Sequence, residues 1–191
     1  MKAEVTADGR RNSSHGHLLA CGLVASYNLD MTPPAFYVET SVWGSLAPRQ
    51  PRDRTQVVRR LLRLLDGVRG TCVISDVVLA EIGRAPVDEA EQIRRHLNGS
   101  DPVVHPISDS IEALALAYIE AGVLPAVREA DALHVAAATC LELDYLVSWN
   151  HRHMTRPMKR LQYESVNRLH GYPRTPLICN PFEACDELRH R

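Results

Sequence analysis

The 191-residue sequence lacks any apolar run that approaches the roughly 20 residues needed to cross a lipid bilayer. We therefore expect no membrane-spanning segment. Residues 17–25 resemble the apolar core of a signal peptide, but the run is short and no small-residue cleavage site follows it. Together these absences predict a cytoplasmic protein rather than a membrane or secreted protein.

The sequence also lacks a paired cysteine framework. Its five cysteines are scattered along the chain: Cys21, Cys72, Cys140, Cys179 and Cys185. An odd, scattered set in a chain of this size predicts reduced thiols. Cys179 and Cys185, with His151 and His153 nearby in sequence, make a zinc site conceivable, but their spacing matches no usual zinc pattern. Buried thiols and surface imidazoles are the favoured interpretation.

Net charge is low as well, at −1 with histidine neutral, so the total charge indicates no polyanionic partner. The charges are nevertheless unevenly distributed, because acidic residues dominate 76–145 while basic residues dominate 49–69 and 149–174. Lysine is almost absent, and nearly all of the 22 basic residues are arginine, whose planar fork suits bidentate contacts with phosphate. A solvated helix face explains either basic segment equally well when it is taken alone.

The composition that is present, 45% hydrophobic and 24% charged, is typical of an ordinary globular protein with one substantial core. Residues 1–34 show no sustained periodicity and include the linker-like segment 12–17. We therefore expect a disordered N-terminal extension over 1–34 and one folded domain over 35–191. Met31 stands just before the first predicted strand, so residues 1–30 are either disordered or precede the genuine start.

Short apolar runs alternate with amphipathic patterns throughout the predicted domain. Strands are predicted at 36–38, 71–74, 102–106, 145–148 and 177–179, and helices at 55–68, 76–84, 88–97, 109–121, 128–141 and 157–170. Residues 180–183 read as a helix capping box with proline at the first helical position. Strands that alternate with helices predict an α/β fold with a mainly parallel sheet.

Polar side chains follow the ends of the predicted strands. Glu39 comes directly after the first strand, and ligands of α/β sheets bind outside the carboxyl ends of strands. Glu81 lies in the helix after the second strand, and Asp131 lies in the first turn of the helix before the fourth. Asn150 comes just past the fourth strand. Strand ends and the N-termini of the following helices share one side of a parallel sheet, so we expect these four side chains to converge.

Such oxygen ligands select hard cations, here Mg²⁺ or Mn²⁺, which can orient a water, lower its pKa and neutralise charge on a phosphodiester. Without a metal, converging carboxylates would repel and raise one another's pKa. Each residue alone has a simpler explanation: Glu39 begins a loop, Glu81 is a solvated helix residue, and Asp131 is favoured by the helix dipole. Their joint placement is what indicates a metal site.

Four segments of the sequence together resemble the PIN-domain family, nucleases that include VapC-like toxins of bacterial toxin–antitoxin pairs. They are 37–42, 75–82, 130–136 and 146–153, within a resemblance that covers 36–186. The resemblance implies a PIN-like three-layer α/β/α sandwich with a mainly parallel sheet of four to five strands. It further implies a Mg²⁺- or Mn²⁺-dependent endoribonuclease. Glu39, Glu81 and Asp131 match the family's acidic positions, and Asn150 matches its last polar position.

Two residues depart from the family's pattern. The first acid is usually aspartate, whereas Glu39 adds a methylene, and the last position is often aspartate, whereas Asn150 is neutral. Both changes lower the expected affinity for a second metal. Two alternatives therefore stay open: a PIN-fold module that binds nucleic acid or protein without cutting, and another phosphate-handling α/β enzyme such as a phosphatase or a DNA nuclease. The resemblance also implies RNA as substrate, a homodimer and an inhibitory antitoxin partner.

Five further residues are candidate substrate contacts: Thr40, Ser41, His134, Arg152 and Arg156. Thr40 and Ser41 could hydrogen-bond a metal-bound water, although helix capping is the simpler interpretation. His134 lies one turn after Asp131 and could orient that carboxylate or touch substrate, although a packing histidine is simpler. The two arginines belong to the second basic segment and could bind phosphate.

Overall fold

The computed structural model describes residues 33–67, 71–150, 154 and 157–189, all within one compact unit, Thr32–Arg191. The predicted N-terminal extension, 1–34, lies almost entirely outside the described residues and stays a prediction. Across the part of the chain that is described, every helix is too short or too polar to span a bilayer.

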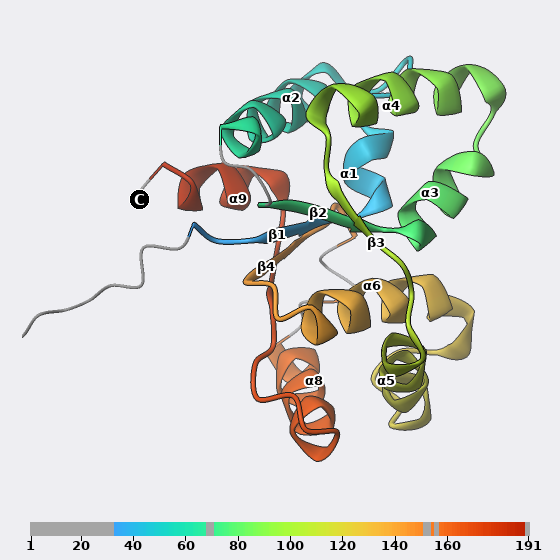
Figure 1. Cartoon of the computed structure of the whole chain (residues 1–191), viewed down its shortest axis with the longest axis vertical. Helices are drawn as coiled ribbons and strands as arrows, with labels where there is room; N and C mark the ends of the chain where they lie inside the picture. Colours follow the sequence, from blue (N-terminus) through green and yellow to red (C-terminus); the bar gives the residue numbers. More distant parts are fainter. Residues whose placement is uncertain (1–32, 68–70, 151–153, 155–156, 190–191) are drawn as a thin grey trace, which may run out of the picture. The chain divides into compact units, whose positions relative to one another are not determined.

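Five strands form one sheet in which every pairing is parallel, in the order β3-β2-β1-β4-β5 (Figure 1). They are β1 (Phe36–Val38), β2 (Cys72–Ser75), β3 (Val103–His105), β4 (Tyr145–Val147) and β5 (Leu177–Cys179). All five predicted strands are therefore present. The central strand is β1, and its three residues are fully buried. After β1 the chain adds β2 and β3 on one side of it, and then adds β4 and β5 on the other side. The direction in which strands are added therefore reverses between β1 and β4.

Helices cover both faces of this sheet. They are α1 (Thr40–Gly44), α2 (Arg52–Asp66), α3 (Asp76–Gly83), α4 (Val87–Ser100), α5 (Asp109–Glu120), the 3₁₀ turn η1 (Ala126–Arg128), α6 (Glu129–Cys140), α8 (Pro157–Leu169) and α9 (Pro181–Glu187). In Figure 1, α2, α4 and α9 lie on one face, and α5, α6 and α8 lie on the other. The structure is thus the α/β three-layer sandwich that the sequence predicted.

Two helix boundaries differ from the prediction by three residues, and the other boundaries differ by at most two. Helix α2 begins at Arg52, three residues before the predicted start. The Thr55 backbone N–H donates to the Pro51 carbonyl at 3.1 Å, so Thr55 lies inside the helix, and its hydroxyl is within hydrogen-bond distance of the carbonyls of Ser45 (2.8 Å) and Pro51 (3.2 Å). Helix α4 continues through Gly99 to Ser100. It ends where Asp101 adopts a left-handed backbone conformation with φ of 42°, and not at the glycine.

The capping box at the start of α9 is confirmed. The Asn180 side-chain oxygen accepts hydrogen bonds from the backbone N–H groups of Phe182 (2.8 Å) and Glu183 (3.1 Å). The Glu183 carboxylate in turn accepts from the Asn180 backbone N–H at 2.8 Å. Three backbone donors at the helix start are thereby paired. By contrast, Ser108 occupies the same position before α5 and makes no side-chain cap.

These two positions give a matched test of the cap. We expect Asn180→Ala to lower the free energy of unfolding by about 0.5–2 kcal/mol, because it removes the hydrogen bonds to the helix start. Ser108→Ala serves as the control and should change that free energy by less than about 0.5 kcal/mol. Urea denaturation of both variants measures the difference. Equal losses of unfolding free energy in the two variants would show that the Asn180 cap does not stabilise the protein.

Candidate active site

Glu39 lies at the carboxyl end of the central strand, as predicted. Val38 pairs with Val147 of β4, so Glu39 is level with Ser148, and its backbone N–H donates to the Val147 carbonyl oxygen at 3.1 Å. The strand order reverses between β1 and β4, and open α/β sheets bind ligands at such a reversal. Glu39 and the residues after β4 therefore flank the place where a ligand is expected.

The Glu39 side chain is almost fully buried, with 3% of the residue exposed. Its carboxylate accepts a hydrogen bond from the Ser41 hydroxyl at 2.5 Å, and the same hydroxyl oxygen accepts from the backbone N–H of Trp149 at 3.0 Å. Among the described residues, no arginine, lysine or histidine forms an ion pair with Glu39. An ionised carboxylate is costly to bury without a compensating charge. This position therefore favours a cation.

Glu81, on α3, is tightly held by hydrogen bonds. One of its carboxylate oxygens accepts from the Thr40 hydroxyl and lies 3.0 Å from Nε2 of His134. Burial by itself would raise the pKa of Glu81, but the hydrogen bonds from His134 and Thr40 outweigh it and hold the pKa below its usual value. Glu81 is therefore ionised at neutral pH and fixed in orientation.

A buried chain of polar groups supports Glu81 from behind. Nδ1 of His134 lies 2.8 Å from the Tyr37 hydroxyl, which lies 2.6 Å from the Ser75 hydroxyl. Because Glu81 is ionised, we assign a proton to Nε2 of His134. With Nδ1 as an acceptor, Tyr37 donates to His134 and accepts from Ser75. Burial raises the pKa of Tyr37 well above its usual value, so the phenol stays protonated as this arrangement requires.

Asp131 and Asn150 lie on two further elements, α6 and the segment after β4. Asp131 lies buried in the first turn of α6, one turn before His134, and forms an ion pair with Arg128 at 3.4 Å. Asn150 follows β4, and its backbone N–H donates to the Ser148 hydroxyl at 2.9 Å. No described hydrogen bond joins Glu39, Glu81 and Asp131 to one another. Likewise, no three His, Cys, Asp or Glu side chains of the described ranges are grouped as a metal cage. Metal binding by these carboxylates stays a prediction.

Three of the five candidate substrate contacts have defined hydrogen-bond partners within the protein, and their contact with substrate stays a prediction. Helix capping by Thr40 or Ser41 is wrong, because their hydroxyls bind Glu81 and Glu39, and α1 has no side-chain cap. His134 bonds to Glu81 and Tyr37, and no hydrogen bond joins it to Asp131. The remaining two candidates, Arg152 and Arg156, lie outside the described residues.

Two residues of this network were missed from the sequence. Ser75 directly precedes α3, where serine is a common helix cap, but its hydroxyl bonds to Tyr37 and makes no cap. The sequence pattern predicts that Tyr37 lies in a buried strand and assigns its hydroxyl no role. Its phenol was a usable signal, since a buried tyrosine hydroxyl usually requires a partner. Both residues lie at or next to the carboxyl end of a strand, which is where α/β sheets bind their ligands.

The cysteines stand apart from this site. The four within the described ranges are free thiols, as predicted, and burial raises the pKa of Cys72 and Cys179 to about 12. Such thiols stay protonated and are poor nucleophiles and metal ligands. The histidines of the conceivable zinc site, His151 and His153, lie outside the described residues.

The hydrogen bond from Thr40 gives a pH-dependent test. We expect Thr40→Val to raise the pKa of Glu81 and to lower the free energy of unfolding at pH 7 by about 1.5–3 kcal/mol, because a hydrogen bond to a charged group is lost. The folded-state pKa of Glu81 lies below the unfolded value of about 4.3. The stabilisation is therefore present above that value and disappears as pH falls through the folded pKa. Chemical denaturation across this range measures it.

Thr55→Val is the matched control, because the Thr55 hydroxyl donates only to carbonyl oxygens. Its effect on the free energy of unfolding should be the same at pH 3 and pH 7. If Thr40→Val also showed no pH dependence, Thr40 would not stabilise the ionised form of Glu81.

No protein-family model matches this chain, and no curated protein matches it. Among solved structures, the chain is similar to the crystal structure of VapBC2 from Rickettsia felis bound to a DNA fragment from their promoter. The sequence identity is 16%, the match covers 76% of this chain and 98% of that chain, and the TM-score is 0.48. A likeness at this level says nothing about activity, so a functional assignment rests on the side chains at the sheet edge.

Proposed function

We propose that this chain is a PIN-like, metal-dependent endoribonuclease that hydrolyses RNA phosphodiester bonds, with Glu39, Glu81 and Asp131 as ligands of Mg²⁺ or Mn²⁺. One observation carries the proposal. Glu39 is almost fully buried where the strand order reverses, and among the described residues it has no basic partner. A divalent cation would supply the missing positive charge at the place where α/β enzymes bind substrates.

The donor set fits a hard divalent cation. All three carboxylates provide oxygen ligands, and one oxygen of each has no hydrogen-bond donor among the described residues. Mg²⁺ keeps several waters and is usually bound through only one or two carboxylates, so a preformed three-ligand cage is not required. The hydrogen bonds from Thr40 and His134 to Glu81 are the kind of outer contact that orients a metal ligand.

A bound divalent cation would supply Lewis acidity toward a water and toward a phosphodiester oxygen. The chain's own residues prepare the site for this chemistry. Ser41 and Thr40 fix the carboxylates of Glu39 and Glu81, and the buried Tyr37–His134 pair prevents Glu81 from turning away. We infer direct attack of water on phosphorus: a new O–P bond forms as the P–O bond to the leaving ribose oxygen breaks, that oxygen gains a proton released by the water, and no covalent enzyme intermediate forms. Asn150 is the neutral polar group at the same sheet edge.

The remaining expectations follow from the PIN resemblance and belong to the same proposal. They are the toxin role in a toxin–antitoxin pair, an inhibitory antitoxin partner, a homodimer and a cytoplasmic location. A small reading frame directly upstream that encodes a DNA-binding fold would support the toxin role.

Cleavage of an RNA panel in Mg²⁺, Mn²⁺ or EDTA tests the proposal. We expect cutting that requires a divalent cation and that falls at least about 100-fold in Asp131→Asn, since loss of outer partners of metal ligands alone costs 10–100-fold. Asp109→Asn is the matched control, because Asp109 is an exposed aspartate in the first turn of another helix. Its cleavage rate should stay within about two-fold of the unmodified protein.

Calorimetric titration with Mn²⁺ supplies a second readout. Glu39→Gln should weaken Mn²⁺ binding, whereas Asp109→Asn should not. A folded protein that binds RNA but cuts none under any metal would contradict the enzyme proposal and support the binding-module alternative. Preferential hydrolysis of DNA or of small phosphate esters would support the other phosphate-handling enzymes instead.

A further inference from the structure

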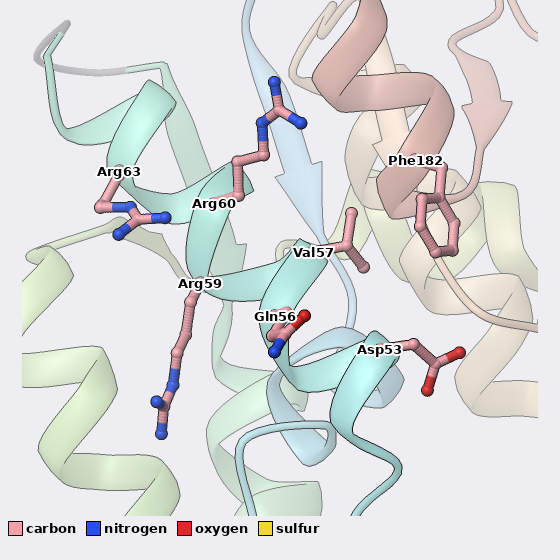
Figure 2. A pocket seen from close by; sticks show the side chains of 7 residues that line it. All are labelled: Asp53, Gln56, Val57, Arg59, Arg60, Arg63 and Phe182. Carbon is pink, nitrogen blue, oxygen red and sulfur yellow. The ribbon is translucent and has the colours of Figure 1, made fainter.

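A groove of about 600 Å³ lies beside α2 and α9 (Figure 2). We call it the α2–α9 groove. It is lined by three arginines of α2 (Arg59, Arg60 and Arg63), by Asp53 of the same helix and by Phe182 of α9. Figure 2 shows the arginines spread along α2 and the Phe182 ring across from this helix. The groove belongs to the first basic segment of the sequence, 49–69, which the candidate active site does not use.

The charges of the α2–α9 groove are not neutralised within the described part of the protein. Arg59 and Arg63 are exposed and Arg60 is half-buried, and none of the three forms an ion pair with a described residue. Asp53 is the single acidic residue among those that line the groove. Like charges four residues apart, such as Arg59 and Arg63, destabilise a helix. An anionic ligand would relieve this repulsion.

Aromatic contacts connect this groove to the candidate active site. The Phe182 ring packs edge-on against the Trp149 ring, with 5.8 Å between the ring centroids. The Arg54 guanidinium lies 4.8 Å from the Trp149 ring centroid, which is cation–π distance. The Trp149 backbone N–H donates to the Ser41 hydroxyl, which in turn donates to Glu39. Groove and carboxylates are therefore linked through Trp149.

We propose that the α2–α9 groove binds single-stranded RNA and leads the strand toward Glu39. Its arginines contact phosphates, and Phe182, which is 48% exposed, stacks on a base. A basic groove combined with an exposed aromatic ring is how proteins hold single-stranded nucleic acid. Single strands are favoured over duplexes because a base must leave its stack to contact Phe182. The groove's role as a substrate surface rests on the proposed nuclease function.

Fluorescence anisotropy of a labelled single-stranded RNA, in EDTA to prevent cutting, tests this groove. The double variant Arg59→Gln/Arg63→Gln should bind about ten-fold or more weakly at low salt. The slope of log affinity against log salt should fall by about 1.4, for two lost phosphate contacts on a single strand. Phe182→Leu, which keeps an apolar side chain beside Trp149, should bind about five-fold or more weakly.

Arg94→Gln/Arg168→Gln is the matched control, since it removes two exposed arginines that do not line the groove. It should keep the salt slope of the unmodified protein, and thermal melting checks that every variant is folded. Equal RNA affinity of the groove and control variants would overturn the proposal. Tighter binding of labelled polyglutamate than of labelled RNA, lost in the groove variant, would also overturn it, in favour of an acidic protein partner.

The two proposals can fail separately. RNA binding that depends on the groove, in a protein that cuts no RNA, would keep the groove as an RNA site and reject the nuclease function. If RNA cutting is metal-dependent, and Arg59→Gln/Arg63→Gln changes neither the RNA affinity nor the cleavage rate, the nuclease function is kept and the groove is rejected as an RNA site.

Discussion

The Tyr37 hydroxyl is buried in the middle of the central strand, and a buried hydroxyl needs hydrogen-bond partners. It finds them in Ser75, at the end of β2, and in His134 on α6. His134 in turn bonds to Glu81 on α3. A single buried polar group thus ties two strands and two helices together at the carboxyl edge of the sheet. The orientation of Glu81 depends on this chain of bonds.

Two surfaces of opposite charge meet at Trp149. The sheet edge carries Glu39 without a basic partner among the described residues and Glu81 with a lowered pKa, so it is negative at neutral pH. The α2–α9 groove beyond Trp149 is positive. On the proposed function, an RNA strand held in the groove would be repelled by the carboxylates until a cation neutralised them. Metal and RNA would therefore bind cooperatively, because each reduces the electrostatic cost of the other.

The features that could be predicted from the sequence are those with local signals. The apolar run that ends at Glu39 and the capping box at Asn180 are each complete within a few residues. The bonding partners of Thr40 and Ser75 could not be predicted in this way. A hydroxyl near a helix start can cap that helix with no distant partner. The hydroxyls of Thr40 and Ser75 bond instead to Glu81 and Tyr37, which are 41 and 38 residues away in sequence. For His134 the sequence favours a packing histidine, which its burial confirms, but its partners Glu81 and Tyr37 lie 53 and 97 residues away in sequence and could not be predicted.

The strand order also determines when the site can form during synthesis. Strand β1 is completed on one side by β2 but on the other only by β4, and the bond from the Ala35 backbone N–H to Asp144 spans 109 residues. At a translation rate of about 5–20 residues per second, β4 is synthesised about 5–20 s after β1. The Trp149 backbone that supports Ser41 and Glu39 arrives later still. The carboxylate edge is therefore assembled only when most of the chain has left the ribosome.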